Sequence, residues 1–188
     1  MKKIVVTHGV GKDHETCKDI VWFSQKLAEA TGAEVEVFFW NSPRHPIPDP
    51  RRFPGFKWVR DFMHEAIRDF AHVSRNKDAI LRTMPAADFY FGHSAGSVLV
   101  SSTGKPCVMT GAPAQLVRDV EINSANTRIL NIMHWLDPIA AMYQGADNVV
   151  LRRPVFRPVI YPPAAHLSYW KSKTVVNMTA DWFSKTVR

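Results

Sequence analysis

The sequence predicts an α/β protein in which helices cover both faces of a mainly parallel sheet, giving a three-layer αβα sandwich. Short apolar or β-branched runs alternate with longer amphipathic segments along most of the chain. Parallel neighbouring strands need crossover connections, and the amphipathic segments between the runs supply them. No internal repeat or linker-like composition divides the 188 residues, so we expect a single domain over residues 1–188.

The first elements follow from hydrophobic periodicity. Residues 2–7 (KKIVVT) are a β-branched run typical of a buried strand. Apolar residues at three- and four-residue spacing predict an amphipathic helix over 13–31, with Ile20, Val21, Phe23 and Leu27 among them. Residues 34–40 (EVEVFFW) first alternate and then become wholly apolar, which predicts a second strand.

A proline-rich segment separates these elements from the middle of the chain. Five prolines fall within residues 41–56, so this stretch is predicted to be a long, stiff loop. Beyond it, Ile67, Phe70, Val73 and Ile80 recur at loosely helical spacing. This spacing predicts one long or broken helix over about 57–82.

The remaining elements continue the alternation of strands and helices. Prolines confine the strands expected after residue 147 to a sheet edge or to irregular structure. The expected elements are strands over 88–91, 106–110, 128–134, 148–151 and 155–161, helices over 95–102 and from 167 to about 185, and a short helix or turn over 113–120.

The stretch Phe89 to Gly96 (FYFGHSAG) carries the strongest chemical signal. It ends in Gly92-His93-Ser94-Ala95-Gly96, which fits the nucleophile-elbow pattern G-x-S-x-G. In that pattern the serine lies on a tight turn between a strand and a helix, and glycines allow the two to approach closely. Ser94 is therefore the predicted nucleophile.

Two later segments complete a recognisable order. RILNIMHWLDPIA puts Asp137 just after a strand, and HLSYW puts His166 just before the last helix. With the Ser94 elbow and the early HGVG, this order resembles the α/β-hydrolase superfamily on its lipase and esterase side. The resemblance implies a reduced sheet of about six strands, because this chain begins where fuller members have already completed two, and it implies no cap domain.

The resemblance assigns a role to each residue. Ser94 would attack an acyl carbon, His166 would take and return its proton, and Asp137 would hold the imidazole tautomer. Backbone N–H groups of Ala95 and of Gly9 or Val10 are the predicted oxyanion hole. The expected activity is hydrolysis of a carboxylic ester or thioester through an acyl-enzyme, with a small-molecule or polymer-borne substrate and no metal or organic cofactor.

Alternatives remain for each residue. Ser94 could simply cap the following helix, since serine is a favoured N-cap. Asp147 or Glu121 could hold the acid role, and His166 could be a solvated loop histidine. The other histidines fit the base less well, and His8 is expected to shape its loop. The aromatic candidates for an acyl pocket, for which ordinary core or rim packing is the alternative, are Trp40, Phe53, Phe56, Tyr143 and Trp170.

The function also has alternatives. A noncatalytic binding protein could use a hydrolase scaffold, and a serine peptidase or amidase would show the same residues. The loop over 41–56 could act as a small lid. The arginines of the two proline-rich loops could favour an acidic substrate or form a solvated face; they are Arg44, Arg51, Arg52, Arg152, Arg153 and Arg157.

Composition limits the remaining classes. The net charge of +7 comes without a recognisable nucleic-acid motif, so no nucleic-acid partner is expected. Only two cysteines are present, which indicates neither a disulfide framework nor a zinc site. The N-terminal apolar run breaks at Thr7 and no run has the length of a membrane span, so a cytoplasmic location is expected. The sequence leaves the oligomeric state open.

Overall fold

A computed structural model describes residues 1–9, 18–40, 56–113, 128–137, 140–142, 146–152, 166 and 168–187 of the chain. Strands and helices alternate over residues 3–110, as the sequence predicts. The elements are β1 (Lys3–Thr7), α1 (Lys18–Thr31), β2 (Glu34–Phe38), α2 (Phe56–Thr83), β3 (Phe89–His93), α3 (Ala95–Ser101), β4 (Cys107–Thr110), β5 (Ile129–His134), β6 (Asp147–Leu151), the 3₁₀ helix η3 (Ser168–Lys171) and α5 (Lys173–Thr186).

The strands form a six-stranded sheet in the order β2-β1-β3-β4-β5-β6. Every pairing is parallel. The predictions of a mainly parallel sheet and of about six strands are therefore confirmed. β6 lies at one edge of the sheet, where its neighbouring prolines are tolerated.

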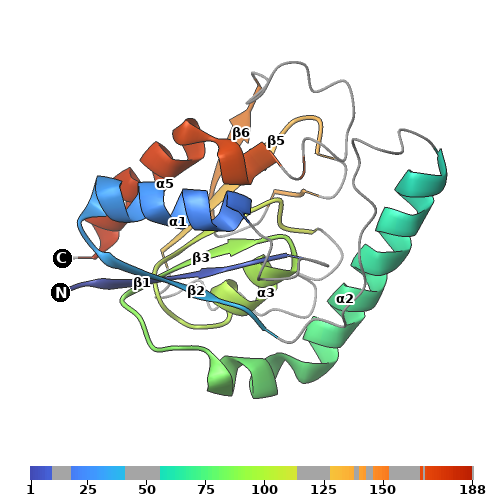
Figure 1. Ribbon diagram of the computed structural model, residues 1–188, viewed down its shortest axis with the longest axis horizontal. Coiled ribbons are helices and arrows are strands. Elements are labelled where there is room, and N and C mark those ends of the chain that lie inside the picture. The colour runs from blue at the N-terminus through green and yellow to red at the C-terminus, as the bar shows by residue number, and fades with distance from the viewer. Residues whose placement is uncertain are drawn as a thin grey trace.

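Helices cover both faces of the sheet and give the three predicted layers (Figure 1). α1 and α5 lie side by side on one face, although one is near the start of the chain and the other at its end. α2 and α3 pack against each other on the opposite face. Both termini lie at the same end of the molecule.

The face under α1 and α5 holds the larger apolar core. Alternate residues of the central strands point into it, including Ile4 and Val6 of β1 and Phe91 of β3. They meet Phe23 of α1, whose ring lies 5.4 Å from that of Trp170, edge to face. This alternation along each strand is the period of two expected where both sides of a sheet are covered.

The intervening strand residues face α2 and α3. Val5, Tyr90 and Met109 belong to this second core, which continues between the two helices. Cys107 is also here, and burial raises the pKa of its thiol to about 12. Cys107 therefore stays protonated at neutral pH and cannot act as a thiolate nucleophile.

Some boundaries and faces differ from the sequence predictions. α2 is one continuous helix, but Ile67 lies on its exposed side, as Val21 does on α1. The final helix is not continuous: it divides at Ser172, which has extended backbone and accepts a hydrogen bond from Val175 N–H as the N-cap of α5. Capping satisfies one of the free N–H groups of a new helix start.

Several predicted segments lie outside the described residues. They are the loop predicted over 41–56 except for Phe56, which begins α2, the short helix or turn predicted over 113–120 except for Pro113, and the strand over 155–161. Within the described part of the chain, no helix has the length and apolar character that crossing a membrane requires.

Two glycines allow α3 to pack tightly on the sheet. A Cβ at Gly92 would lie 2.6 Å from the Gly96 carbonyl oxygen, so strand and helix touch through their backbones. A Cβ at Gly96 would lie 2.6 Å from the His8 carbonyl oxygen and 2.9 Å from that of Thr7, so α3 also rests on the end of β1. The turn from β3 into α3 therefore needs glycine at both positions.

We expect Gly96→Ala to lower the free energy of unfolding by about 2 kcal/mol or more, because its methyl group would overlap backbone atoms that cannot move independently. Gly104→Ala is the control: its φ of 70° gives strain of about 1–2 kcal/mol, but the added carbon would have open space. Urea unfolding followed by circular dichroism measures both. A Gly96→Ala variant no less stable than Gly104→Ala would contradict the close contact.

Candidate active site

The candidate site lies at the point in the sheet where the chain changes the side on which it adds successive strands. From β1 the chain crosses through α1 to β2 on one side, and from β3 it crosses through α3 to β4 on the other. The connections leaving the carboxyl ends of β1 and β3 therefore diverge, and ligands of open parallel sheets bind in the crevice this creates. Gly9 follows β1 and Ser94 follows β3 at this point.

Ser94 has a strained backbone. Its φ of 54° and ψ of −121° make it the one non-glycine residue with positive φ among the described residues. Its N–H donates to the Thr110 carbonyl (2.9 Å), and Ser97 Oγ donates to the Gly92 carbonyl (3.0 Å), so neighbouring groups hold the turn. The Ser94 side chain makes no capping hydrogen bond to α3. Ser94 therefore occupies the N-cap position of α3 without using its side chain as a cap.

The end of β1 lies directly beside Ser94. A Cβ at Gly9 would lie 2.6 Å from the Ser94 Cβ and 3.2 Å from the His93 ring, so only glycine fits there. Ala95, the other predicted oxyanion donor, is buried at the first position of α3. Val10 lies outside the described residues. The predicted oxyanion residues that are described thus both adjoin Ser94.

His8 has a structural partner in Trp40. The two rings stack with centroids 5.1 Å apart and planes 4° from parallel, and Trp40 Nε1 donates to the His8 carbonyl (3.0 Å). β2 ends at Phe38, before Trp40, and this contact gives Trp40 a place against the loop after β1. His8 and Trp40 therefore hold each other at the end of β1, and the shaping of the loop by His8 stays a prediction.

Asp137 and His166, distant in sequence, form a buried pair. His166 Nδ1 lies 3.0 Å from Asp137 Oδ2 and 3.1 Å from Oδ1. Both residues are buried. An ionised carboxylate can only accept hydrogen bonds, so Nδ1 carries the proton and Nε2 of the neutral ring is left as the basic nitrogen.

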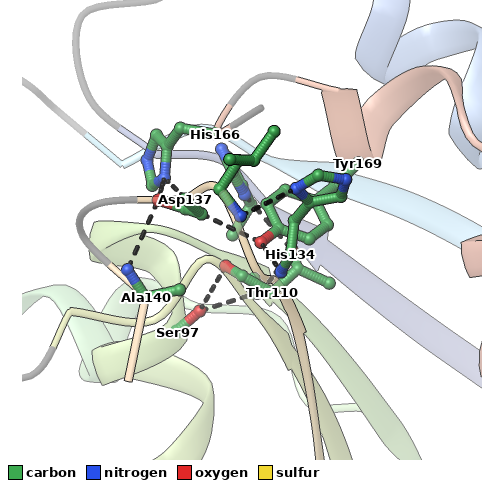
Figure 2. Close-up of polar contacts among 10 residues, drawn as sticks. Ser97, Thr110, His134, Asp137, Ala140, His166 and Tyr169 are labelled. Atoms are coloured by element: carbon green, nitrogen blue, oxygen red, sulfur yellow. Dashed lines mark hydrogen bonds and ion pairs between the residues drawn. The ribbon is translucent and has the colours of Figure 1, made fainter. Parts of the chain in front are cut away.

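Other groups also bond to the Asp137 carboxylate (Figure 2). The Tyr169 hydroxyl donates to Oδ2 (2.9 Å) and itself accepts the His134 N–H (2.7 Å). The Ala140 N–H donates to Oδ1 (3.3 Å). Burial raises the pKa of Tyr169, and the charge of Asp137 raises it further, so its phenol stays protonated. The buried carboxylate thus has donors on both oxygens.

The backbone beyond Asp137 is held against the end of β4. Ala141 N–H donates to the Ala112 carbonyl (3.0 Å), and Pro113 pairs with Ala140 in an isolated antiparallel bridge. Asn131, inside β5, donates from Nδ2 to the Ala141 carbonyl (2.8 Å). These contacts fix the loop whose Ala140 N–H reaches Asp137.

Gly111 allows the pair to approach the sheet. It has a φ of 55°, and a Cβ there would lie 2.9 Å from His166 Cε1 and 3.1 Å from Asp137 Oδ2. Gly111 follows β4, whose neighbour β3 leads into Ser94. The His93 ring, adjacent to Ser94 in the chain, lies 4.8 Å from the His166 ring between centroids. The pair and the elbow therefore meet at the carboxyl ends of β3 and β4.

Two of these residues were missing from the sequence predictions. Tyr169 lies three residues after His166, within one helical turn, and it was visible in HLSYW without a role. Gly111 follows a predicted strand directly, which is a position where glycine often permits a left-handed turn. Only the tertiary contacts with Asp137 reveal what each one does.

The alternative acids and bases lie elsewhere or are not described. Asp147 is exposed at the amino end of β6, the opposite end of the sheet from the site. His64 and His72 lie on α2, and His72 stacks on the outer side of Trp40 (6.2 Å). Glu121 lies outside the described residues. Asp137 and His166 are thus the pair that the described structure brings together.

Most residues of the predicted lid, and some of those predicted for the acyl pocket, lie outside the described part of the chain. Residues 41–55, which include Phe53, lie outside the described residues, as do Tyr143 and five of the six loop arginines; Arg152 is described. Trp170 is fully buried between α1 and the sheet, so it belongs to the core. Ser94 is 2% exposed. No cluster of potential metal ligands occurs in the part of the chain that is described.

Comparison with protein-family models, with curated proteins and with solved structures found no match to this chain. The fold is therefore defined by its own topology as an α/β three-layer sandwich. The candidate site consists of residues at the carboxyl ends of β1, β3, β4 and β5 together with His166 and Tyr169.

The buried phenol predicts a specific loss of stability at alkaline pH. In the unfolded chain Tyr169 ionises near its ordinary pKa of 10.0, whereas burial and Asp137 raise the pKa in the folded protein. Above pH 10 unfolding releases a proton, so the free energy of unfolding falls by about 1.4 kcal/mol per pH unit from this residue. Tyr169→Phe has no phenol to ionise, so it lacks this contribution to the loss of stability. Urea unfolding near pH 9 and pH 11 should show the smaller loss in Tyr169→Phe; equal losses would contradict the raised pKa.

Proposed function

We propose that this protein is a serine hydrolase that cleaves carboxylic ester or thioester bonds through Ser94, His166 and Asp137. The observation that carries the proposal is the backbone of Ser94, a non-glycine residue held at φ 54° with no capping role for its side chain. Such strain costs about 1–3 kcal/mol, and in folded proteins it concentrates at functional sites.

Two further features support the proposal. The His166–Asp137 hydrogen bond provides a base whose tautomer is defined by a carboxylate. The pair is buried beside His93, the residue before Ser94. A nucleophile on a strained turn, with a base oriented by a third group nearby, is the general arrangement of acyl-transfer enzymes.

In the proposed reaction Ser94 Oγ attacks the acyl carbon while its proton passes to His166 Nε2. The carbonyl π electrons move onto oxygen, and the N–H groups of Ala95 and of Gly9 or Val10 would bind that oxyanion. Asp137 stabilises the imidazolium without taking its proton. When the carbonyl re-forms, the bond to the leaving group breaks and His166 gives that group the proton.

The acyl-enzyme is then hydrolysed by the same groups. His166 takes a proton from water as the water oxygen attacks the acyl carbon, and it returns that proton to Ser94 Oγ when the second tetrahedral intermediate collapses. The products are a carboxylic acid and the alcohol or thiol released earlier. The residues supply every proton transfer in this cycle.

We expect a fluorophosphonate probe to label the folded protein at Ser94, because the probe's phosphorus reacts with an activated serine oxygen. Ser94→Ala should abolish labelling and the hydrolysis of p-nitrophenyl butyrate. Ser101→Ala is the control, since Ser101 is another buried serine, at the end of α3, and its Oγ donates to the Val98 carbonyl in the same helix. Mass mapping of the adduct locates the site. Full turnover in Ser94→Ala would show that the nucleophile is wrong.

We expect Asp137→Asn to lower kcat by about 10³- to 10⁴-fold, because an amide stabilises the wrong histidine tautomer and no imidazolium charge. Asp147→Asn should change kcat less than about twofold, since Asp147 is exposed on the far end of the sheet. Steady-state kinetics on an ester panel, with circular dichroism to verify folding, tests both. Equal effects of the two substitutions would remove Asp137 from the acid role. An amide substrate in the same panel separates an esterase from an amidase.

A further inference from the structure

The Tyr169 hydroxyl has an imposed direction. It is fully buried, and its oxygen accepts the backbone N–H of His134 at 2.7 Å. Because that N–H occupies the acceptor side of the oxygen, the hydroxyl proton points toward Asp137 Oδ2, 2.9 Å away. The phenol is thus a fixed donor to the carboxylate and not a freely rotating group.

This donor acts on the same oxygen as the histidine. Asp137 Oδ2 receives both the Tyr169 hydroxyl and the shorter contact from His166 Nδ1, while Ala140 N–H reaches Oδ1. Without the Tyr169 hydroxyl, the carboxylate would lose one of its two bonds on Oδ2 and could rotate more freely about its Cβ–Cγ bond. Its negative charge would also be less dispersed, which makes it a stronger partner for a protonated imidazole.

One chain segment carries two side chains, His166 and Tyr169, that bond to Asp137. His166 lies just before η3 and Tyr169 lies inside it, and the bond from His134 N–H ties this segment to the last residue of β5. Tyr169 and Trp170 are buried in the core under α1 and α5. The rigid core therefore determines where His166 meets Asp137.

We propose that Tyr169 is a positioning residue, whose hydroxyl fixes the rotation of the Asp137 carboxylate and sets the pH range in which His166 is available as a base. Its consequence for turnover rests on the proposed hydrolase function. Its effect on His166 does not, because the hydrogen bonds exist without substrate.

Two other titratable rings lie in this cluster among the described residues. His93 of β3 packs against His166 and lies 5.6 Å from the Tyr169 ring, between centroids. His134 ends β5, and its Nδ1 lies 3.2 Å from Leu136 N. A pH profile of activity alone could mix these three histidines, so the test must observe His166 by itself.

Tyr169→Phe removes only the hydroxyl, and Tyr90→Phe is its matched control. The Tyr90 hydroxyl likewise accepts a backbone N–H, from Ala87, and donates to the Pro85 carbonyl. It lies on β3 at the end away from Ser94. Both variants therefore lose a tyrosine hydroxyl that bridges two groups, but only one of those hydroxyls contacts Asp137.

The experiment records ring ¹⁵N shifts of His166 against pH, and fluorophosphonate labelling rates, for wild type and both variants. We expect Tyr169→Phe to move the His166 titration to higher pH by about one unit and to slow labelling at neutral pH about tenfold. The acid limb of the labelling profile should move with it. Tyr90→Phe should leave all three unchanged.

The outcomes separate the two proposals. An unmoved His166 titration in Tyr169→Phe, or equal changes in both variants, would overturn the positioning role. If wild-type protein gives no adduct at Ser94, the hydrolase proposal fails, but the titration still decides the role of Tyr169. Should Tyr169→Phe fail to fold, Asp137→Asn in the same titration gives the second test. We expect the wild-type protein to show a slowly exchanging proton resonance from the Tyr169 hydroxyl, and Asp137→Asn to lose it. A resonance that persists unchanged in Asp137→Asn would overturn the positioning role.

Discussion

The buried carboxylate of Asp137 is the constraint on which the rest of the site depends. An isolated carboxylate at this depth would be costly, so the surrounding chain must supply donors. His166 and Tyr169 reach it from one segment, and Ala140 reaches it from the loop after β5. Gly111 makes room for the arrangement. These residues come from three segments, namely the turn after β4, the loop after β5 and the stretch before α5, so satisfying one charge also orders the chain at the carboxyl ends of the strands.

The sheet topology decides where this edge can act. β1 and β3 are neighbours whose outgoing connections diverge, and Gly9 lies directly beside Ser94 where these two strands end. The order of the first five strands, 2-1-3-4-5, is shared by other doubly wound sheets that bind quite different ligands. The fold therefore does not select a reaction by itself. The chemistry therefore depends on the serine, the histidine and the carboxylate at the carboxyl ends of the strands.

Much of this organisation could be predicted from local sequence, since strands, turns and helices have local signals. Gly92 and Gly96 around Ser94 marked the elbow, and the strand that ends before Asp137 indicated that this residue lies at the carboxyl end of a strand. The role of Tyr169 could not be found in this way. It depends on the backbone N–H of His134 facing the phenol, which is a matter of how η3 sits on β5. Periodicity within each segment carries no information about that contact.

The strained backbone of Ser94 bears on whether this serine has a chemical or a structural role. The turn is held by bonds that do not involve the serine hydroxyl: Ser94 N–H to Thr110, and Ser97 Oγ to Gly92. Glycine at position 94 would satisfy the same backbone without the penalty of a side chain at positive φ. Neither turn geometry nor helix capping therefore accounts for serine at this position. Serine differs from glycine by a CH2OH group, and the hydroxyl is the reactive part of that group, which favours a chemical role for Ser94 over a structural one.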